Sequence, residues 1–303
     1  MSILVVGSVA FDSIKTPFGE VDEVLGGSAC YFSTSASFFT DVSLVAVVGE
    51  DFPEEHVDFL QSRNIDLAGL QRGSGETFRW KGRYEYDLNE AHTLETHLNV
   101  FESFQPELPE NYRDAEYVFL ANIDPELQLE VLQQVKNPQL VACDTMNFWI
   151  EGKKEALIKT LARVDILAIN EAEVRQLADE PNLVKAAQIV RDFGPKTLVV
   201  KRGEYGVLMF GEGSIFSAPA YPLEEVFDPT GAGDTFAGGF IGYLAATRNF
   251  DEHNLRKAIV FGTVMASFTV EKFSLDRLKE IDYPEIEARF RRIKLLTDFA
   301  DID

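Results

Sequence analysis

The sequence predicts a soluble α/β protein in which a mostly parallel central sheet is covered by helices on both faces. Short apolar runs typical of buried strands alternate along the chain with runs whose apolar residues recur at helical spacing. Parallel strands need crossover connections, and these connections put helices over both faces of the sheet. The strand candidates are Ile3–Gly7, Leu44–Gly49, Tyr117–Ala121, Leu140–Asp144, Ile166–Asn170 and Thr197–Lys201.

Helical patterns fill most of the gaps between these strands. In one of them Pro53 stands near the first turn, where proline is tolerated because the N–H groups of that turn have no partner within the helix. The helix candidates are Ser28–Phe39, Pro53–Arg63, Pro125–Val135, Lys153–Leu161 and Leu183–Phe193.

Two segments interrupt the alternation of strand and helix. Residues 13–25 are short and contain proline and glycine, and residues 76–101 read as extended chain. The stretch T-F-R-W-K-G-R-Y-E-Y, residues 77–86, alternates strictly and therefore gives a strand two different faces. One face carries Phe78, Trp80, Tyr84 and Tyr86, and the other carries Arg79, Lys81 and Arg83. We predict that the two segments form a small accessory sheet.

The bulk composition limits the number of domains and the class of partner. The chain has 303 residues and shows no internal repeat, low-complexity tract or linker, so one domain over residues 1–303 is expected. Its 28 Lys and Arg residues are outnumbered by 50 Asp and Glu, for a net charge of −22. Binding to nucleic acid needs basic side chains against the phosphates, so no nucleic-acid partner is expected. A small anion remains compatible, because backbone N–H groups bind it locally.

Cysteine usage and the first residues indicate the compartment. Cys30 and Cys143 form no C-x-x-C pair, so neither a disulfide framework nor a structural zinc site is suggested. The start M-S-I-L-V-V-G-S-V-A-F-D lacks the basic region of a signal peptide. No apolar run approaches the roughly 18 residues of a membrane span. We therefore expect a cytoplasmic protein without a membrane partner.

The run D-P-T-G-A-G-D-T-F-A-G-G-F, residues 228–240, surrounds one carboxylate with glycines. Helical spacing over residues 235–247 makes Gly231, Ala232 and Gly233 the start of a helix, whose first N–H groups and dipole attract an anion. Asp234 would repel a phosphate, so it fits better as the base for a neutral hydroxyl held in line with a phosphoryl group. The alternative is an ordinary helix start in which Asp234 only complements the dipole.

This run resembles the C-terminal signature of the ribokinase-like (PfkB) family of carbohydrate and nucleoside kinases, and further similarities cover nearly the whole chain. Gly26-Gly27 is similar to the N-terminal Gly-Gly signature of the family, and Asp12 to its substrate-hydroxyl aspartate. The remaining matches are D-T-M-N at Asp144 to Asn147, N-E-A-E at Asn170 to Glu173, and V-K-R-G-E-Y-G at Val200 to Gly206. Each of these motifs lies at a strand end or a helix start, on the side where open α/β sheets bind ligands.

The resemblance implies a three-layer α/β/α ribokinase-like fold with a small β-sheet lid formed by residues of about 12–25 and 76–102. It implies an enzyme that moves the γ-phosphoryl group of magnesium-ATP to a hydroxyl, expected to be a hydroxymethyl group, of a sugar or sugar derivative. Asp234 would be the catalytic base. The backbone N–H groups of Gly231, Ala232 and Gly233 would form an anion hole for the transferred phosphoryl group.

The same resemblance implies binding residues for the nucleotide and its metal ion. Asn170 and Glu173 would organise magnesium and its waters, while Gly203, Val226 and Thr263 would border the adenine and ribose of ATP. Lys201 stands where the family commonly has threonine, and it would reach a phosphate as a point charge. Taken singly, these residues have plainer interpretations: Asn170 as a helix cap, Lys201 as a solvated side chain and Thr263 as a core residue.

The acceptor site is expected to include Asp12, Gly26, Gly27, Tyr31, Phe78, Trp80, Arg79 and Asn147. The sequence departs from the family here, since Ala10 and Tyr31 stand where two sugar-binding asparagines are usual. An inward aromatic face of the lid would stack on a sugar or a nucleobase, and an inward basic face would suit an acceptor that already carries phosphate. A third possibility is that the aromatic face packs on a second lid in a homodimer.

The sequence favours a carbohydrate acceptor slightly over a nucleoside, because no pattern in it indicates recognition of a nucleobase. A non-catalytic sugar or nucleotide sensor is the alternative from another class. Near the C-terminus, E-K-F-S at residues 271–274 lacks the Gly-Ala pair common in the family, which argues against a monovalent-cation site.

Overall fold

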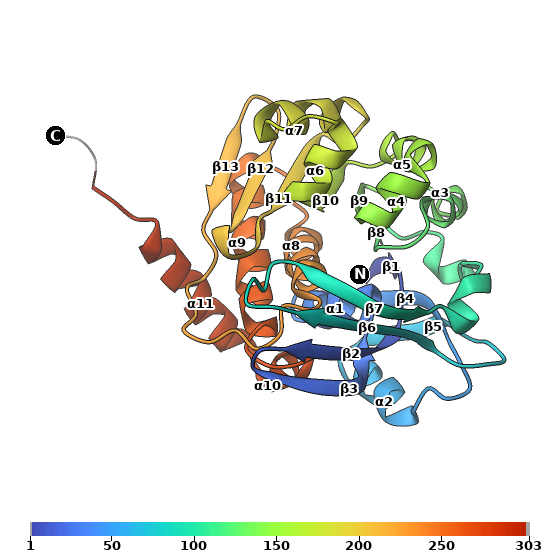
Figure 1. Ribbon diagram of the computed structural model, residues 1–303. Helices are drawn as coiled ribbons and strands as arrows, with labels where there is room; N and C mark the ends of the chain where they lie inside the picture. The colour runs from blue at the N-terminus through green and yellow to red at the C-terminus, as the bar shows by residue number, and fades with distance from the viewer. Residues whose placement is uncertain (1, 301–303) are drawn as a thin grey trace.

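A large sheet of nine strands forms the body of the protein in the computed structural model, which describes residues 2–300 (Figure 1). The order across the sheet is β13-β12-β11-β10-β9-β8-β1-β4-β5. All neighbouring pairs from β5 to β11 are parallel, and β12 and β13 join as antiparallel strands at one edge. The strands are β1 Ser2–Val6, β4 Asp41–Val48, β5 Ile65–Arg72, β8 Tyr117–Leu120, β9 Leu140–Asp144, β10 Ile166–Asn170, β11 Thr197–Lys201, β12 Val207–Phe210 and β13 Ile215–Ala218.

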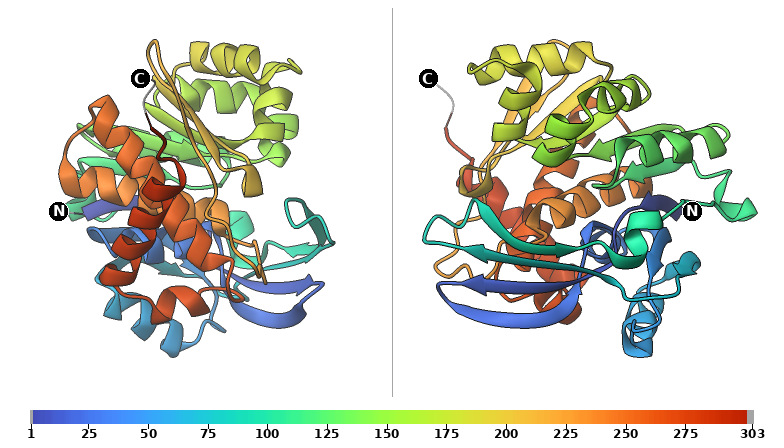
Figure 2. Two further views of the ribbon diagram at one scale, coloured as in Figure 1. Left: turned by 90° about the vertical axis from the view of Figure 1, so that its left-hand side faces the viewer. Right: turned by 45° about the vertical axis from the view of Figure 1, so that its right-hand side comes forward.

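Helices cover both faces of this sheet, as Figures 1 and 2 show. One face packs on α1 Ser28–Ala36, α2 Glu54–Ser62, α8 Ala232–Thr247, α9 Glu252–Thr269, α10 Asp276–Glu280 and α11 Tyr283–Leu296. The other face packs on α3 Pro125–Gln134, α4 Asn147–Gly152, α5 Lys154–Leu161, α6 Glu171–Ala178 and α7 Leu183–Asp192. The predicted three-layer α/β/α fold is therefore confirmed.

Alternation along the strands decides which side chains face which helical layer. In β11, Val199 packs in the layer of α8 and α9, whereas Leu198 and Val200 pack in the layer of α6 and α7. In β9, Ala142 lies in the first layer and Cys143 in the second. Because side chains repeat with a period of two, the last residues of β9 and β11, Asp144 and Lys201, belong to the layer of α8.

The chain reverses its direction of travel across the sheet at β1. From β1 it proceeds to β4 and β5 on one side and then to β8 and all later strands on the other side. Ligands of open α/β sheets bind outside the carboxyl ends of the strands at such a switch point. The segment that leaves the carboxyl end of β1 leads directly into the lid.

The lid is a second sheet of four strands in the order β3-β2-β6-β7, separate from the large sheet in Figures 1 and 2. Its strands are β2 Ala10–Thr16, β3 Gly19–Gly26, β6 Phe78–Tyr84 and β7 Ala91–His97. β2 pairs with β6 in parallel, so that Asp12 lies opposite Trp80 and both point to the same face. The connecting 3-10 turns are η1 Asn99–Ser103, η2 Glu110–Tyr112 and η3 Gly203–Tyr205.

The six predicted strands and five predicted helices are present, with ends that shift by up to three residues. Three strands were not predicted. β5 carries polar residues between its apolar ones, and β12 and β13 are only four residues each. Tyr86 was expected on the aromatic face of the lid strand, but β6 ends at Tyr84 and the side chain of Tyr86 is 93% exposed.

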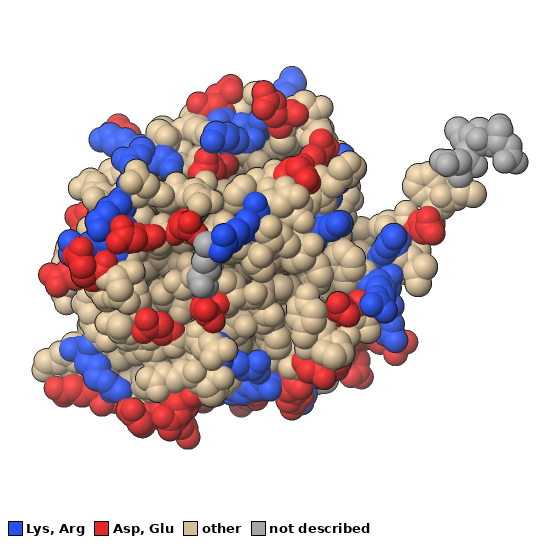
Figure 3. All heavy atoms as spheres, turned by 180° about the vertical axis from the view of Figure 1, so that it is seen from behind, with Lys and Arg blue, Asp and Glu red and all other residues tan. Residues whose placement is uncertain are grey.

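The surface carries charges of both signs. Viewed from behind, acidic and basic side chains are interspersed over the body of the molecule (Figure 3). Over residues 2–300, no helix combines the length and the apolar character needed to cross a membrane.

Candidate active site

Helix α8 begins at a turn that only glycine allows. Gly231 precedes the helix with φ of 72°, in the left-handed region, and a Cβ atom on it would lie 2.4 Å from the ring of Tyr31. Within the described chain, no side chain caps this end of the helix. The N–H of Ala232 donates to the Pro229 carbonyl at 3.1 Å, so the anion hole expected at residues 231–233 has one of its donors already engaged. The start of α8 still presents its positive dipole end toward the lid.

Asp234 lies in the first turn of α8 and has an unusual protonation equilibrium. Its pKa is raised to about 7, first by burial and then by the carboxylate of Asp144, while the ammonium group of Lys201 opposes the shift. A carboxylate with a pKa near neutrality is well matched to general-base work. The role of Asp234 as the base stays a prediction.

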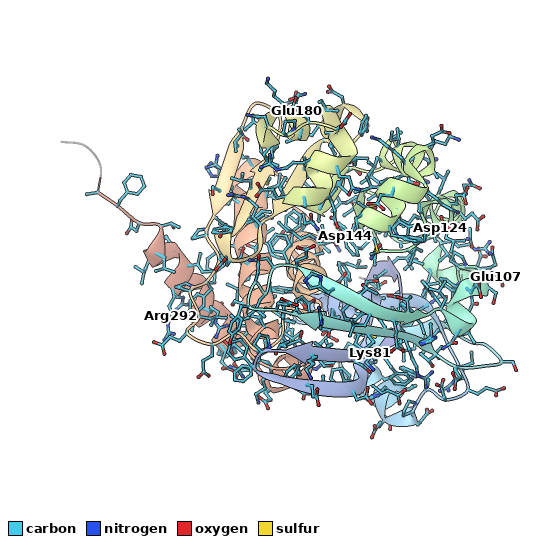
Figure 4. All side chains as sticks on the ribbon, in the orientation of Figure 1. Lys81, Glu107, Asp124, Asp144, Glu180 and Arg292 are labelled. Atoms are coloured by element: carbon cyan, nitrogen blue, oxygen red, sulfur yellow. The ribbon has the colours of Figure 1, made fainter. Side chains whose placement is uncertain are left out.

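Lys201 and Asp144 form an ion pair beside this helix start. The Nζ atom of Lys201 lies 2.7 Å from Oδ2 of Asp144, and their side chains are 18% and 5% exposed. A Cβ atom on Gly233 would lie 3.1 Å from the same Nζ atom. In Figure 4, Asp144 is labelled in the region between the large sheet and the lid. The ammonium group therefore sits over the first turn of α8.

Asp12 approaches the site from the lid. Burial raises its pKa to about 7, the N–H of Gly27 opposes that shift, and the carboxylates of Asp228 and Asp234 add to it. A Cβ atom on Gly26 would lie 1.9 Å from Oδ2 of Asp12, and one on Gly27, whose φ is 91°, would lie 2.6 Å from the Ser8 carbonyl oxygen. The Gly-Gly pair thus leaves room for the carboxylate of Asp12 and for a close passage of two chain segments.

The lid also touches the glycine-rich turn directly. The hydroxyl of Thr230 donates to the Tyr84 hydroxyl at 3.2 Å, and Asp228 accepts the N–H groups of Thr230 and Ser274 at 2.9 and 3.1 Å.

Tyr31 is buried, and burial together with the carboxylate of Asp12 raises the pKa of its hydroxyl. Among residues 2–300, the Tyr31 hydroxyl is one of the buried polar atoms for which no hydrogen-bond partner is found.

Asn170 and Glu173 form a capping box at the start of α6. The side chain of Asn170 accepts the N–H of Glu173 at 2.8 Å, and the side chain of Glu173 accepts the N–H of Asn170 at 3.0 Å. The cap interpretation of Asn170 therefore describes this structure. Burial raises the pKa of Glu173 to about 7, and Lys201 opposes this shift.

The residues near Glu173 fit a magnesium ion that is held mainly by phosphates and water. Over residues 2–300, no group of three or more His, Cys, Asp or Glu side chains is arranged to hold a metal ion. Magnesium in kinase sites takes one or two carboxylates and keeps several waters. Glu173 is a buried carboxylate of the kind that this arrangement needs.

The other expected nucleotide residues lie around the antiparallel edge of the sheet. Gly203 has φ of 54°, and Asn89 at the tip of the lid hairpin accepts the N–H of Glu204 at 3.3 Å. Thr263 is buried in α9, where its hydroxyl donates to the Ile259 carbonyl, and Val226 is half-buried in the loop before α8.

The expected acceptor residues are only partly brought together. Trp80 shares the face of Asp12, and its ring packs over Gly82. The ring of Phe78 is stacked on Phe101 at 5.3 Å, and Asn147 is exposed at the start of α4.

Arg79 points to the opposite face of the lid from Asp12, as alternation along β6 requires. Its guanidinium group is paired with Glu23 at 2.7 Å and Asp51 at 2.8 Å. The structure does not place Arg79 with the other expected acceptor residues, and the aromatic face of the lid is the one that faces Asp12.

Sequence reasoning assigned no site role to Asp228, matched Asp144 only to a family motif, and considered Tyr84 only as one ring of the aromatic face of the lid. Asp144 ends a buried strand and Lys201 ends another, and charged residues at the ends of buried strands are a signal that could have indicated their place in the site. The pairing itself was not readable, because β10 lies between the two strands and their order in the sheet was unknown.

The fold and this cluster define a class of protein: a small-molecule kinase with an anion-binding helix start and a carboxylate beside it. A family model described as pfkB family carbohydrate kinase matches residues 2–280. The chain belongs to the pfkB family of carbohydrate kinases, and it is an ATP-dependent kinase with an alcohol group as acceptor.

Among curated relatives, the cytidine kinase of Thermococcus kodakarensis is 32% identical over 258 residues, which make up 83% of this chain and 91% of that protein. The ribokinase of Haemophilus influenzae is 35% identical over 117 residues, or 37% of this chain and 36% of that protein.

Solved structures agree on the fold. The ribokinase of Thermotoga maritima aligns with a TM-score of 0.75 at 21% identity, covering 96% of this chain and 99% of that one. A putative ribokinase II of E. coli in complex with ATP and magnesium aligns at 0.78 and 18% identity, covering 96% and 99%.

Proposed function

We propose that the protein transfers the γ-phosphoryl group of magnesium-ATP to the hydroxymethyl group of a nucleoside, with cytidine as the first candidate. The observation that carries the chemistry is the juxtaposition of Asp234 with the glycine-rich start of α8. The acceptor hydroxyl oxygen forms a bond to the γ-phosphorus, and the bond from this phosphorus to the bridging oxygen of ADP breaks. The proton of the hydroxyl passes to Asp234, and the products are ADP and the phosphate ester.

Positioning and charge neutralisation supply most of the catalysis in such a reaction. Asp12 is placed to accept hydrogen bonds from acceptor hydroxyls, since its carboxylate is buried on the face of the lid that meets α8. Gly231 and Gly233 bring backbone close to the phosphoryl group. Glu173 would help to hold magnesium, and the metal would supply positive charge to the phosphates when it is bound.

The nucleotide is proposed to extend from the start of α8 toward Gly203, with Val226 and Thr263 along the adenine and ribose. The support is topological: η3, which contains Gly203, follows the carboxyl end of β11, and α9 packs closely against α8. The carboxyl ends of parallel strands are where open α/β sheets bind nucleotides.

Two observations favour a nucleoside over a free sugar. A cytidine kinase aligns over 83% of this chain at 32% identity, whereas the ribokinase match covers 37% of it, and an inositol 3-kinase that aligns over 97% is only 24% identical. The face of the lid beside Asp12 is aromatic, with Trp80 and Tyr84, and such rings stack on a nucleobase. A free sugar is the second candidate, because the family model is that of carbohydrate kinases.

The experiment is a panel assay of ATP consumption with magnesium. Wild type and the Asp234→Asn variant are compared on cytidine, uridine, adenosine, inosine, ribose, fructose, inositol and their monophosphates. We expect phosphate ester from cytidine, and a loss in the variant of about 10²–10⁴-fold in kcat with acceptor binding largely kept. Turnover of a sugar alone would contradict the nucleoside assignment. Unchanged turnover in the variant would remove Asp234 as the base.

A homodimer through the lid and a cytoplasmic location belong to the same proposal. Every residue of β7 is exposed, so the lid has an open edge that a second copy would cover. Both cysteines are free and buried, which fits a reducing compartment. Sedimentation of wild type against Leu94→Pro tests the dimer, because proline in this exposed strand disfavours the pairing of β7 with a second strand.

A further inference from the structure

Lys201 stands at a place in the fold from which its ammonium group meets the start of α8. It closes β11, and Asp144 closes β9, with β10 between the two strands. Alternation sends both side chains into the layer of α8, so the lysine reaches across the carboxyl end of β10 to the carboxylate.

The surroundings keep Lys201 charged. Burial by itself lowers the pKa of an ammonium group, but the carboxylates of Asp144, Glu173 and Asp234 outweigh that effect and raise the pKa of Lys201. A buried lysine is expensive to charge unless it is paired and hydrogen-bonded. The site therefore maintains a fixed positive charge in a setting from which water is largely excluded.

This charge lies where a transferred phosphoryl group would arrive. The Nζ atom is 3.1 Å from the position of a Cβ atom on Gly233, in the first turn of α8. An ammonium group has three N–H donors, and the bond to Asp144 at 2.7 Å uses one of them. Two donors remain for phosphoryl oxygens that approach the glycine-rich turn.

We propose that Lys201 is a catalytic residue whose ammonium group binds the transferred γ-phosphoryl group and neutralises charge on it, and that Asp144 is the positioning residue that holds the ammonium group in reach. This inference rests on the proposed phosphoryl transfer. Lys201 stays protonated throughout, while the hydroxyl proton passes to Asp234 and ADP leaves with the electron pair of the broken bond.

An ion pair of Lys201 and Asp144 with only a structural role would affect nucleotide binding differently from a catalytic Lys201. A purely structural pair would stabilise the carboxyl ends of β9 and β11 equally in the absence and presence of nucleotide. A catalytic Lys201 discriminates between nucleotides that have a γ-phosphoryl group and nucleotides that lack one, because the Coulomb attraction of its charge is strongest for the nearest phosphoryl group and weakens with distance.

Nucleotide affinity tests this without any acceptor. Dissociation constants for AMP-PNP and for ADP, both with magnesium, are measured by calorimetry on wild type, Lys201→Met and the control Lys196→Met. Lys196 precedes the same strand and pairs with Asp165 at 2.8 Å, but its side chain is 82% exposed. We expect Lys201→Met to weaken AMP-PNP at least tenfold more than ADP, and Lys196→Met to change neither. An equal effect on both nucleotides would overturn the proposal.

Steady-state kinetics provide a second test of Lys201, with the acceptor that the panel assay of ATP consumption identifies. Lys201→Met is expected to lower kcat by about 10²–10³-fold, the range for loss of one charge-stabilising donor, with KM for the acceptor nearly unchanged. Lys201→Arg should restore part of this loss.

The double variant Lys201→Met with Asp144→Asn separates charge from folding, because it leaves no unpaired carboxylate behind. It should remain as slow as the single variant. Recovery to within threefold of wild type would overturn the proposal, since the loss would then come from the unpaired Asp144. Silence of wild type across the whole panel would defeat the proposed function, and the nucleotide measurements would still decide the role of Lys201.

Discussion

Gly26 stands so close to Asp12 that a Cβ atom on Gly26 would lie 1.9 Å from Oδ2 of the carboxylate. The two residues belong to neighbouring strands of the lid, β3 and β2, whose register places Val24 opposite Asp12. The absence of a side chain at position 26 is therefore what lets Asp12 adopt its buried position against Gly27.

The Gly26→Ala variant should consequently lose acceptor affinity, because the added methyl group displaces the carboxylate that binds the acceptor hydroxyls. We expect KM for the acceptor to rise about tenfold or more, equivalent to at least about 1.4 kcal/mol, with the dissociation constant of AMP-PNP nearly unchanged. Steady-state kinetics and calorimetry measure the two quantities. Gly152→Ala is the control, since a Cβ atom there has nothing within 4 Å. An unchanged KM would show that Asp12 does not touch the acceptor.

Gly231→Ala should both destabilise the fold and impair phosphoryl transfer. Its left-handed backbone alone costs a non-glycine residue about 1–2 kcal/mol, and the contact of 2.4 Å with the ring of Tyr31 adds to that cost. The control is Gly213→Ala, because Gly213 has φ of +73° but open space around its Cβ position. Urea unfolding should show a larger loss for Gly231→Ala than for Gly213→Ala. Equal losses of unfolding free energy in the two variants would mean that the ring of Tyr31 moves to make room for the added methyl group.

Activity should rise with pH as Asp234 loses its proton. Since the pKa of Asp234 is about 7 and only the carboxylate accepts a proton, kcat/KM should fall as pH decreases below about 7. The Asp144→Asn variant should move this limb to lower pH, because the carboxylate of Asp144 raises the pKa of Asp234. Asp58→Asn, at an exposed position in α2, should leave the profile in place. If the pH profile of Asp144→Asn equals that of wild type, the carboxylate of Asp144 does not raise the pKa of Asp234.

Asp12 gives a stability prediction of definite sign. Its folded pKa of about 7 exceeds the ordinary 3.8, so the folded state holds the proton more tightly than the unfolded state. The contribution is fully present below about pH 4 and is lost as pH rises through 7. Asp12→Asn should therefore be more stable than wild type at pH 8, and the gain should vanish near pH 4. Urea unfolding at the two pH values measures it, and an equal gain at both would contradict the raised pKa.

Tyr84→Phe should weaken the hold of the lid on the glycine-rich turn. The variant loses the hydrogen bond of 3.2 Å from Thr230 and leaves the ring in place. We expect KM for the acceptor to rise severalfold, since one hydrogen bond contributes about 0.5–1.5 kcal/mol. Tyr86→Phe is the matched control, because the side chain of Tyr86 is 93% exposed. Equal kinetics for the two variants would show that the lid closes without this bond.

The layers of the fold were predictable because periodicity records burial. Six buried strands and their crossover helices followed from apolar runs, and Gly231 and Asp234 were found through the chemistry of a glycine-rich helix start. β5 was missed because an edge strand with one covered face contains polar residues and does not form an apolar run.

The parts of the site that escaped prediction depend on partners far apart in the sequence. Arg79 could not be placed without knowing that Asp51 and Glu23 lie on its side of the lid. Phe78 was expected to face the acceptor, yet Phe101 stacks on it. Asn170 has two plausible roles from its spacing alone, and the bond from the N–H of Glu173 identifies it as a cap here.

The two-residue period of β11 has a consequence for how this gene tolerates changes of length. One codon inserted within Thr197–Lys201 would turn the ammonium group toward α6 and α7, whereas a second inserted codon would turn it back. Codons added in the surface loops leave that orientation untouched. A scan of insertions across this strand should therefore alternate between inactive and partly active products, while the loop from Gly211 to Ser214 absorbs extra residues freely.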